Sequence, residues 1–336
     1  MRTLAALALA ALAARPAWGA FGTSARATTT AGFLQLGVGG RAVAMGEAYT
    51  ALADGADSLY WNPAGLSRIK GRDATFMHAA YLGSSSYDYG AYAQNVGESG
   101  ALGLGLQYFS AGSLTQTDET GTDMGSFSPY DLAASAGYAN TFDGRPWAGL
   151  SGWSAGLAGK FIKSRILSSA QTGALDLGAL SPAYLGGRLR LAMAAANIGG
   201  KMKFDAESED LPTTFKLGGA YQLSEGWLAS TDLGFPRNNQ PFVAVGTEYW
   251  LVSAGPWRLA GRAGFNSKTL SSVDGLTGVS FGIGIGYDGA SLDYGFVPVG
   301  SLGMAHRVSL SMKWGKTEGK PEYNIEAPKY PILLMQ

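Results

Sequence analysis

The sequence predicts an all-β fold, namely a transmembrane antiparallel β-barrel of about 14 strands. The first indication is composition. Only 15% of the 336 residues are charged, against roughly 25% in ordinary soluble domains, and 50 residues are glycine. The second is a series of short segments in which apolar residues alternate with small or polar ones. The third is the alternation of short and long connections between these segments.

Charge and cysteine content exclude several classes of protein. Lys plus Arg equals Asp plus Glu at 25 each, so no basic surface points to a nucleic-acid partner. The absence of cysteine excludes disulfides, thiolate nucleophiles and cysteine-ligated metal centres. The two histidines, His78 and His306, also have no ligand-spaced neighbours, and we expect no cofactor, no metal site and no enzymatic activity.

Residues 1–19 are expected to be a signal peptide. Arg2 supplies a positive start, residues 4–14 are apolar, and Ala17-Trp18-Gly19 has the small residues that precede cleavage. The mature chain is therefore expected to be exported. No later segment approaches about 20 uninterrupted apolar residues, so a membrane form must be a barrel.

Residues 71–315 carry the predicted barrel. The clearest strand is 278–287, in which alternate positions are apolar and the positions between them are glycine or serine. The expected strands begin near Asp73, Tyr87, Gly100, Tyr130, Trp153, Gln171, Gly187, Thr213, Gly226, Phe242, Trp257, Gly278, Ala290 and Met304. On this assignment Phe281 and Ile283 face lipid, Gly282 faces the lumen, and Gly282→Ser is expected to be milder than arginine on the lipid face.

Charged residues of both signs fall on the faces opposite the apolar stripes. They are Lys160, Asp176, Arg190, Lys216, Asp232, Glu248, Arg262, Asp293 and Arg307. We expect these side chains to face the lumen, where they brace the wall, hold a plug or set selectivity. Asp293 and Arg307 lie on adjacent predicted strands and are expected to neutralise one another. A soluble sandwich also has polar outer faces, but aromatic residues at many strand ends favour a membrane barrel.

The connections give an independent indication. With both chain termini in the periplasm, connections 113–128, 199–211 and 266–277 face outward, and these are the long ones. The connection 141–152 is longer than this rule predicts for the periplasmic side. Residues 316–336 are expected to form a periplasmic C-terminal tail.

Residues 20–70 differ from the barrel. The alanine-rich stretch 41–53 predicts a short helix that ends at Asp54-Gly55. Residues 37–42 fit the dinucleotide-binding pattern G-x-G-x-x-A, but no helix–strand alternation follows, which argues against a cofactor.

The run F-L-Q-L-G-V-G-G-R-A-V-A-M-G-E-A-Y-T-A-L-A-D-G-A-D-S-L-Y-W-N-P-A-G-L at 33–66 closely resembles the N-terminal signature of the PorV/PorQ family, within the FadL-like outer-membrane proteins. Weaker matches lie at 173–180, 195–199, 211–218 and 292–311. The resemblance implies a barrel with an N-terminal hatch, residues 20–70, folded inside the lumen. The family's hatch motif corresponds here to Asn62, Pro63 and Ala64.

The resemblance implies two functions for a protein of the bacterial outer membrane. Like FadL, the chain would allow passive passage of hydrophobic small molecules. Like PorV, it would instead bind exported cargo of a type IX-like secretion system. Its expected partners are outer-membrane lipid, a hydrophobic ligand, and secretion machinery or exported proteins.

Two features that resemble metal or catalytic sites are given simpler interpretations. His78 and His306 are the only histidines and are expected to be strand-end residues. The acidic loop with Asp118, Glu119 and Asp123 lacks full calcium-loop spacing and is expected to be solvated.

Overall fold

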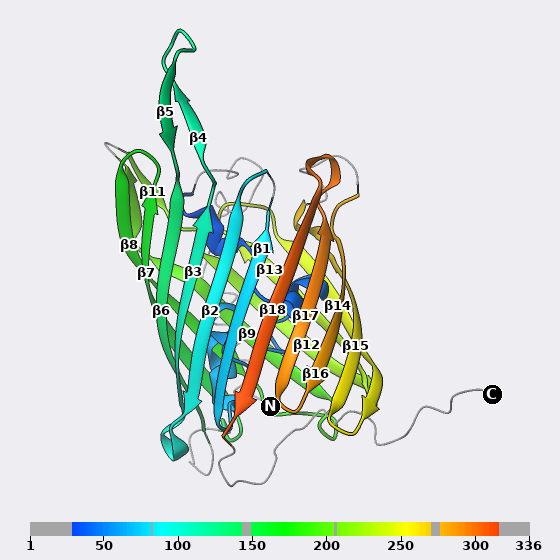
Figure 1. Ribbon diagram of the computed structural model, residues 1–336. Helices are drawn as coiled ribbons and strands as arrows, with labels where there is room; N and C mark the ends of the chain where they lie inside the picture. Colours follow the sequence, from blue (N-terminus) through cyan, green and yellow to red (C-terminus); the bar gives the residue numbers. More distant parts are fainter. Residues whose placement is uncertain (1–28, 82, 143–148, 205–206, 270–275, 316–336) are drawn as a thin grey trace, which may run out of the picture.

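The computed structural model describes residues 29–81, 83–142, 149–204, 207–269 and 276–315. Fourteen strands close into an antiparallel barrel, and the circle is completed where β1 pairs with β18 (Figure 1). The expected signal peptide at 1–19 and tail at 316–336 lie outside the described residues. The predicted closed barrel is confirmed.

The observed strands match the sequence-based starts to within two residues. The barrel strands are β1 Arg72–Ala80, β2 Ser86–Asn95, β3 Ala101–Ser110, β6 Tyr130–Thr141, β7 Ser154–Arg165, β8 Ser169–Leu180, β9 Leu189–Gly199, β12 Thr214–Ser224, β13 Trp227–Pro236, β14 Phe242–Ala254, β15 Trp257–Asn266, β16 Val279–Tyr287, β17 Ala290–Pro298 and β18 Met304–Trp314. Each pairs with its neighbours along the chain, apart from the β1–β18 closure. The period-2 pattern was sufficient to locate the strands, because each strand has one apolar face.

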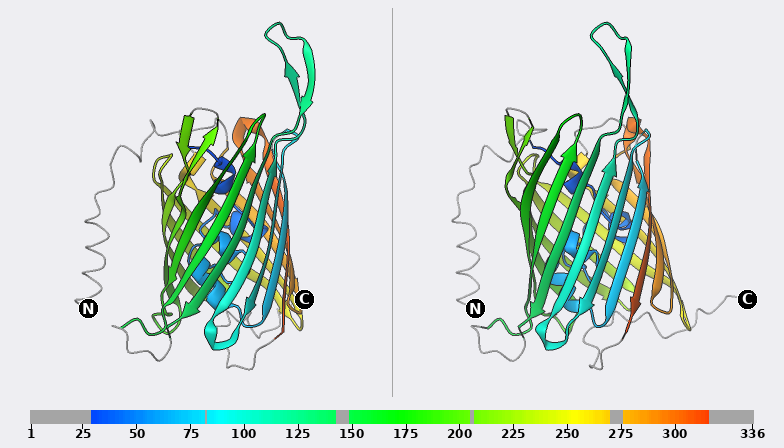
Figure 2. Two further views of the ribbon diagram at one scale, coloured as in Figure 1. Left: turned by 90° about the vertical axis from the view of Figure 1, so that its left-hand side faces the viewer. Right: turned by 60° about the vertical axis from the view of Figure 1, so that its left-hand side comes forward.

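The long connections at one end of the barrel contain additional hairpins. β4 (Leu114–Thr117) and β5 (Asp123–Phe127) form a separate two-stranded ribbon that projects beyond the barrel (Figure 2). β10 (Lys201–Phe204) and β11 (Glu207–Asp210) form a second. Short 3-10 turns occur at η5 (Gly97–Ser99), η6 (Ser267–Thr269) and η7 (Gly300–Leu302).

The outer face of the barrel is apolar. Large side chains that alternate along the strands are about half exposed there, including Leu104, Phe161, Leu217, Ile283 and Leu310. Most of the positions between them face inward and are glycine, alanine or polar residues, with a few larger apolar side chains such as Met77 and Ile162. An apolar outer face with a polar interior is the pattern of a barrel that lies in lipid. In the described residues, no helix has the length and apolar character needed to cross a membrane.

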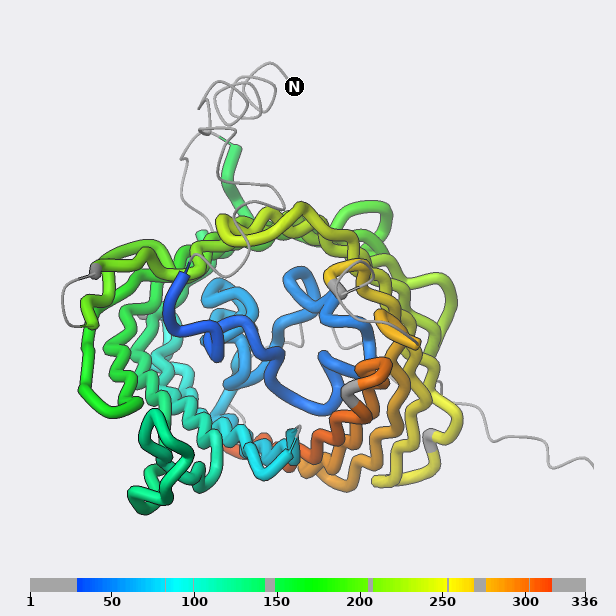
Figure 3. The backbone as a smooth tube through the Cα atoms, turned by 90° about the horizontal axis from the view of Figure 1, so that it is seen from above, coloured from blue at the N-terminus to red at the C-terminus, as the bar shows by residue number. Residues whose placement is uncertain are grey.

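Residues 29–71, here called the luminal segment, occupy the inside of the barrel (Figure 3). Thr29 bridges Asp210 at the end with the long hairpins, and the segment runs to β1 at the opposite end. It contains η3 (Gly32–Gln35), α2 (Gly40–Ala44), α3 (Ser58–Trp61) and η4 (Pro63–Arg68).

The helix expected at 41–53 is much shorter than predicted. α2 ends at Ala44, because Gly46 and Glu47 adopt left-handed backbone conformations with φ of 66° and 67°. A side chain at Gly46 would overlap the backbone of Phe265 on β15. Close packing against the wall therefore overrides the helix propensity of the alanines.

Candidate functional site: the luminal segment against the barrel wall

Asn62 fastens the luminal segment to the wall. Its side chain is fully buried at the start of η4, where Oδ1 accepts a hydrogen bond from Ala64 N at 3.1 Å. Its Nδ2 donates to Thr50 O at 3.0 Å and to Ala179 O on β8 at 3.3 Å. One side chain thus caps a turn, ties two parts of the segment together and binds a wall strand.

The wall approaches this motif so closely that only glycine fits. A Cβ at Gly178 on β8 would overlap Asn62 Oδ1, and one at Gly156 on β7 would overlap the backbone of Pro63 and Ala64. Inward-facing glycines therefore admit the backbone of the motif. The structure thereby places Asn62, Pro63 and Ala64 together, buried, at the wall.

A chain of buried charges links α2 to three wall strands. Arg41 donates through Nε and Nη2 to both carboxylate oxygens of Glu248 on β14, each at 2.8 Å. Arg262 on β15 bridges Glu248 at 2.6 Å and Asp293 on β17 at 2.7 Å. A bidentate pair of this kind fixes orientation as well as charge. Sequence reasoning selected the three wall residues but missed Arg41, for which the available signal was a single charge within an apolar run.

Asp232 on β13 anchors the next part of the segment. Its Oδ2 accepts hydrogen bonds from Tyr49 N, Thr50 N and Thr50 Oγ1 at 3.2, 3.0 and 2.5 Å. Lys216, on the neighbouring strand β12, lies over the Trp61 ring with its Nζ 4.6 Å from the ring centroid. Both predicted lumen residues therefore contact the luminal segment.

The pair Lys160 and Asp176 braces the wall itself. Lys160 Nζ on β7 lies 2.6 Å from Asp176 Oδ2 on β8 and 2.9 Å from Asn197 Oδ1 on β9. Asn197 has φ of 58° at the point where the β8–β9 register shifts. The ion pair therefore spans an irregularity in the wall. Arg190, partly buried on β9, also faces inward.

The expected pairing of Asp293 with Arg307 is wrong. In the β17–β18 register Arg307 lies opposite Gly295, and Asp293 instead pairs with Arg262. Arg307 donates to Gly37 O and to Tyr81 Oη, each at 3.2 Å. Adjacent strands were predicted correctly, but the register that decides partners could not be read from the sequence.

Three carboxylates lie close together near the end of the barrel with short turns: Asp54 and Asp57 of the luminal segment and Asp73 of β1. Lys313 Nζ on β18 lies 3.8 Å from Asp54 and 3.7 Å from Asp73. Burial raises the pKa of Asp57 to about 7, and the neighbouring Asp54 and Asp73 add to the rise. For Asp54, Lys313 and Arg41 outweigh the opposing effect of burial and lower its pKa to about 2.

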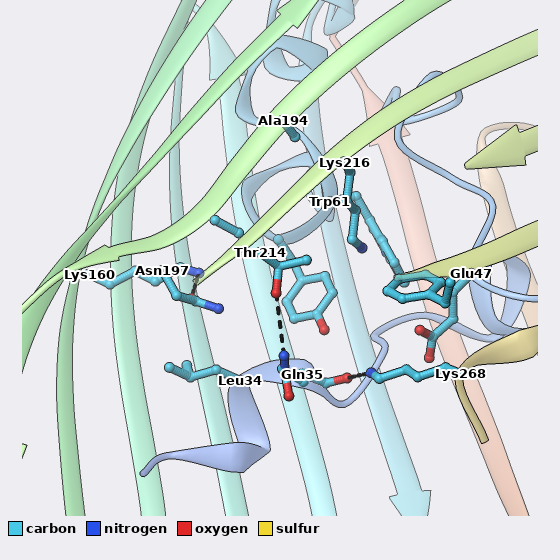
Figure 4. A pocket seen from close by; sticks show the side chains of 13 residues that line it. Leu34, Gln35, Glu47, Trp61, Lys160, Ala194, Asn197, Thr214, Lys216 and Lys268 are labelled. Atoms are coloured by element: carbon cyan, nitrogen blue, oxygen red, sulfur yellow. Dashed lines mark hydrogen bonds between the residues drawn. The ribbon is translucent and has the colours of Figure 1, made fainter. Parts of the chain in front are cut away.

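An inner cavity of about 30 Å³ lies between the luminal segment and strands β7, β9 and β12 (Figure 4). Its lining includes Leu34, Trp61, Lys160, Lys216 and Lys268. A volume of this size holds water rather than an organic ligand. In the described conformation this cavity therefore has no room for an organic ligand.

An outer cavity of about 150 Å³ lies at the end with the long hairpins and is lined by Thr30 and Ala31 among others. Leu34 and Gln35 of η3 line the inner cavity, and Thr30 and Ala31, which directly precede η3, line the outer one. Asn238, in the β13–β14 connection, tethers this part of the luminal segment: its amide donates to Thr29 Oγ1 at 2.8 Å and Gln35 Oε1 at 3.1 Å. Asn238 was not identified from the sequence, because a single asparagine in a polar loop carries no pattern that indicates a contact inside the barrel.

The histidines and the acidic loop serve local structure. His78 Nδ1 lies 2.7 Å from Asp88 Oδ1, and His306 Nδ1 lies 2.7 Å from Tyr294 Oη. Asp118 accepts hydrogen bonds from Thr120 and Thr122 within its own turn. Across the described part of the chain, no three His, Cys, Asp or Glu side chains are grouped to hold a metal ion.

Comparison with protein families places residues 22–225 in a single match, to the family described as type IX secretion system protein PorV. The match covers the luminal segment and the barrel as far as β12. No curated protein matches the chain.

Solved structures of outer-membrane channels share the fold. The Pseudomonas putida toluene transporter TodX has a TM-score of 0.54 at 13% identity, covering 84% of this chain and 99% of its own. The Ralstonia pickettii toluene transporter TbuX has 0.52 at 12%, covering 83% and 99%. A Pseudomonas aeruginosa FadL homologue has 0.50 at 11%, covering 85% and 98%.

Proposed function

This chain belongs to the family of type IX secretion system protein PorV, and from that premise we propose that it allows hydrophobic small molecules to pass passively through the outer membrane, without enzymatic chemistry. The barrel lies in the bacterial outer membrane, with its apolar face in lipid. The solved structures with the same fold include proteins described as toluene transporters.

The observation that carries this proposal is a contiguous apolar cluster within the otherwise polar interior. One contiguous cluster of buried residues includes Leu34 and Trp61, which line the inner cavity, and Phe109 and Phe204 of the outer cavity pack against it. A hydrophobic molecule that enters at the long-hairpin end therefore meets apolar side chains on both sides of η3. Because the inner cavity is so small, passage requires the luminal segment to shift.

The test is uptake by cells that carry the protein in their outer membrane. We expect radiolabelled toluene to enter faster than in cells without it, while radiolabelled glucose enters at an unchanged rate. Equal toluene uptake in both would contradict the proposal. A rise in both rates would indicate a leak rather than a hydrophobic path.

A second candidate is an accessory role in secretion, in which the protein binds exported cargo. The family's description favours it. The β4–β5 ribbon also favours it, because the ribbon projects from the barrel and its outer edges have no strand partner among the described residues. Such edges pair readily with another extended chain.

Mass spectrometry of detergent-purified material separates the two candidates. Retained hydrophobic small molecules support passage, whereas retained exported proteins support the accessory role. Deletion of residues 113–127 provides the control, since it removes the ribbon but leaves the lumen intact. Only protein retention is expected to depend on it.

A further inference from the structure

We propose that the outward face of β1 and β2 binds a second copy of this chain, forming a dimer whose two-fold axis runs along the membrane normal. The two strands lie side by side next to the closure of the barrel (Figure 1). The inference is independent of the proposed function, because it concerns the lipid-facing surface and leaves the lumen unchanged.

This face is poorer in large apolar side chains than the neighbouring wall. On β1 and β2 the exposed large apolar residues are Phe76 and Tyr92, and the other outward positions are small or polar. The adjacent strand β3 alone exposes Leu102, Leu104 and Leu106. Small residues gain little from contact with lipid tails, but they let the backbone of another protein approach closely.

A polar pair lies within the same face. His78 Nδ1 lies 2.7 Å from Asp88 Oδ1, and the two side chains are 55% and 34% exposed. β1 ends at Ala80, so His78 occupies the outward position next below the strand end, between Ala80 and Phe76. An ionisable pair on a lipid-facing surface is costly, and a protein neighbour with polar groups at the same height reduces that cost.

The shape of the face is self-complementary. In the β1–β2 register Phe76 lies opposite Gly90, and Ala74 lies opposite Tyr92, so each row pairs a large side chain with a small one. A two-fold axis between the strands places each residue against its register partner in the second copy. Phe76 then fills the space over Gly90 of the second copy, where an added Cβ meets no atom within 4 Å.

The polar row is complementary in the same way, since His78 lies opposite Asp88 in the register. A carboxylate only accepts, so His78 Nδ1 donates to Asp88 of its own chain. As an imidazolium, His78 can also donate through Nε2 to the Asp88 carboxylate of the second copy, and the symmetry makes this contact twice. Both copies insert in the same direction, so the same row of each chain meets at the same depth.

The experiment is cysteine cross-linking in intact outer membranes. The chain has no cysteine, so Ala74→Cys introduces the only thiol, on the proposed interface. A short bis-maleimide should then give a dimer band on a denaturing gel. Leu217→Cys is the matched control: Leu217 is 50% exposed on β12, on the opposite side of the barrel, and should remain monomeric.

Two further changes, each added to Ala74→Cys, test the shape and the charges. Gly90→Leu fills the space that receives Phe76 and should lower the cross-linked fraction about tenfold, the effect of one overpacked side chain. His78→Asp places like charges together and should also lower it. Combining His78→Asp with Asp88→His restores a complementary pair and should restore the dimer.

Equal dimer yields from Ala74→Cys and Leu217→Cys would overturn the proposal, since random collision would explain both. A dimer unchanged by Gly90→Leu would overturn it as well. No cross-link at all in Ala74→Cys would show that lipid covers the face, and a cross-link to a different protein without a dimer band would assign the face to that protein. Gly90→Leu keeps the test decisive if His78→Asp does not assemble, because leucine is well tolerated on a lipid-facing surface.

Discussion

At the scale of single residues, Asn62 shows how one buried amide determines the position of a whole segment. Each of its hydrogen bonds joins parts of the chain that are otherwise separate: the η4 turn, Thr50 and β8. Removing a buried partner leaves the opposite groups unsatisfied, at about 1–3 kcal/mol. The identity of the residue therefore matters more than its volume.

We predict that Asn62→Ala leaves the barrel folded but loosens the luminal segment. Trypsin should then cleave after Arg41 or Arg68. In the docked state these side chains lie inside the barrel, where Arg41 is hydrogen-bonded to Glu248 and Arg68 to Ala53 O. Asn95→Ala is the matched control, since Asn95 accepts from Gly97 N at an exposed turn. Equal protection of wild type and Asn62→Ala would show that Asn62 is not a fastening point.

The raised pKa of Asp57 predicts the direction in which docking of the luminal segment depends on pH. Its pKa of about 7 in the folded chain exceeds the ordinary 3.8, so the folded state retains a proton that the unfolded segment has lost. The free energy of undocking should therefore fall as pH rises from about 4 to about 7, then level off. Asp54 acts in the opposite direction, but only below about pH 4.

This dependence can be measured by hydrogen–deuterium exchange of residues 29–71 at about pH 5 and about pH 8, corrected for intrinsic rates. We expect faster exchange at the higher pH. Asp57→Asn should remove the difference, because the amide does not titrate. The groups that face Asp57 are Asp54, Asp73, Lys313, Arg41 and Tyr89, so a dependence that persists in Asp57→Asn would belong to one of them.

At the scale of elements, η3 lines the inner cavity and is held in place by side chains from elsewhere in the barrel. Gln35 Nε2 donates to Asn238 Oδ1 at 3.0 Å. It also donates to Thr214 Oγ1 at 3.3 Å, and Lys268 Nζ donates to Gln35 O at 3.2 Å (Figure 4). A four-residue 3-10 turn has little intrinsic stability. Its place in the lumen therefore depends on these tethers.

We predict that Asn238→Ala raises toluene uptake several-fold, because η3 loses its hydrogen bonds to the β13–β14 connection and can move away from the inner cavity more easily. Asn239→Ala is the control: the neighbouring amide accepts only a local hydrogen bond from Gln240 N in the described structure. Faster exchange of η3 without faster uptake would show that η3 does not limit passage.

The barrel strands were predictable to within a few residues, whereas the luminal contacts were not. Alternation of the kind seen in 278–287 is a local property of the sequence. Partners such as Arg41 and Glu248 are 207 residues apart and meet only after barrel closure fixes the register. The expected Asp293–Arg307 pair failed for the same reason.

Gly282 illustrates a second limit. The sequence correctly gives it to the inner face, but a Cβ there would overlap Ala44 Cβ and Tyr294 O, so Gly282→Ser is not the mild change expected. Sequence alternation tells which face a residue occupies. It does not tell how closely another segment approaches that face.

The assignment of the lipid face is better tested by arginine substitutions at two positions of the same strand that lie at different depths in the membrane. Ile283 is 52% exposed at the centre of β16, and Tyr287 ends the strand. We predict that Ile283→Arg impairs assembly by roughly 2–4 kcal/mol, and Tyr287→Arg by about 0–1. Assembly yield and migration on gels before and after boiling give the measurement. Equal effects would contradict the membrane assignment of this face.

At the scale of the whole molecule, the barrel and its luminal segment are one packed unit. Small eight-stranded barrels are filled by their own side chains, and barrels of about 16–18 strands leave an aqueous channel. Fourteen strands lined with glycine and alanine would leave open space, which the luminal segment fills. The buried charges that hold it would otherwise be solvated by water in an open pore.

We therefore predict that wild-type protein in planar lipid bilayers shows little ionic conductance, and that deletion of residues 29–70 produces large, steady channels. The remaining wall charges, such as Glu248, Arg262 and Asp232, would then line a water-filled pore and make it sensitive to salt. Asn62→Ala should fall between the two, with brief openings, because its segment is loosened but present. Large conductance in wild type would show that the segment does not close the lumen. A deletion variant that folds by gel migration yet stays silent would show that the wall closes by itself.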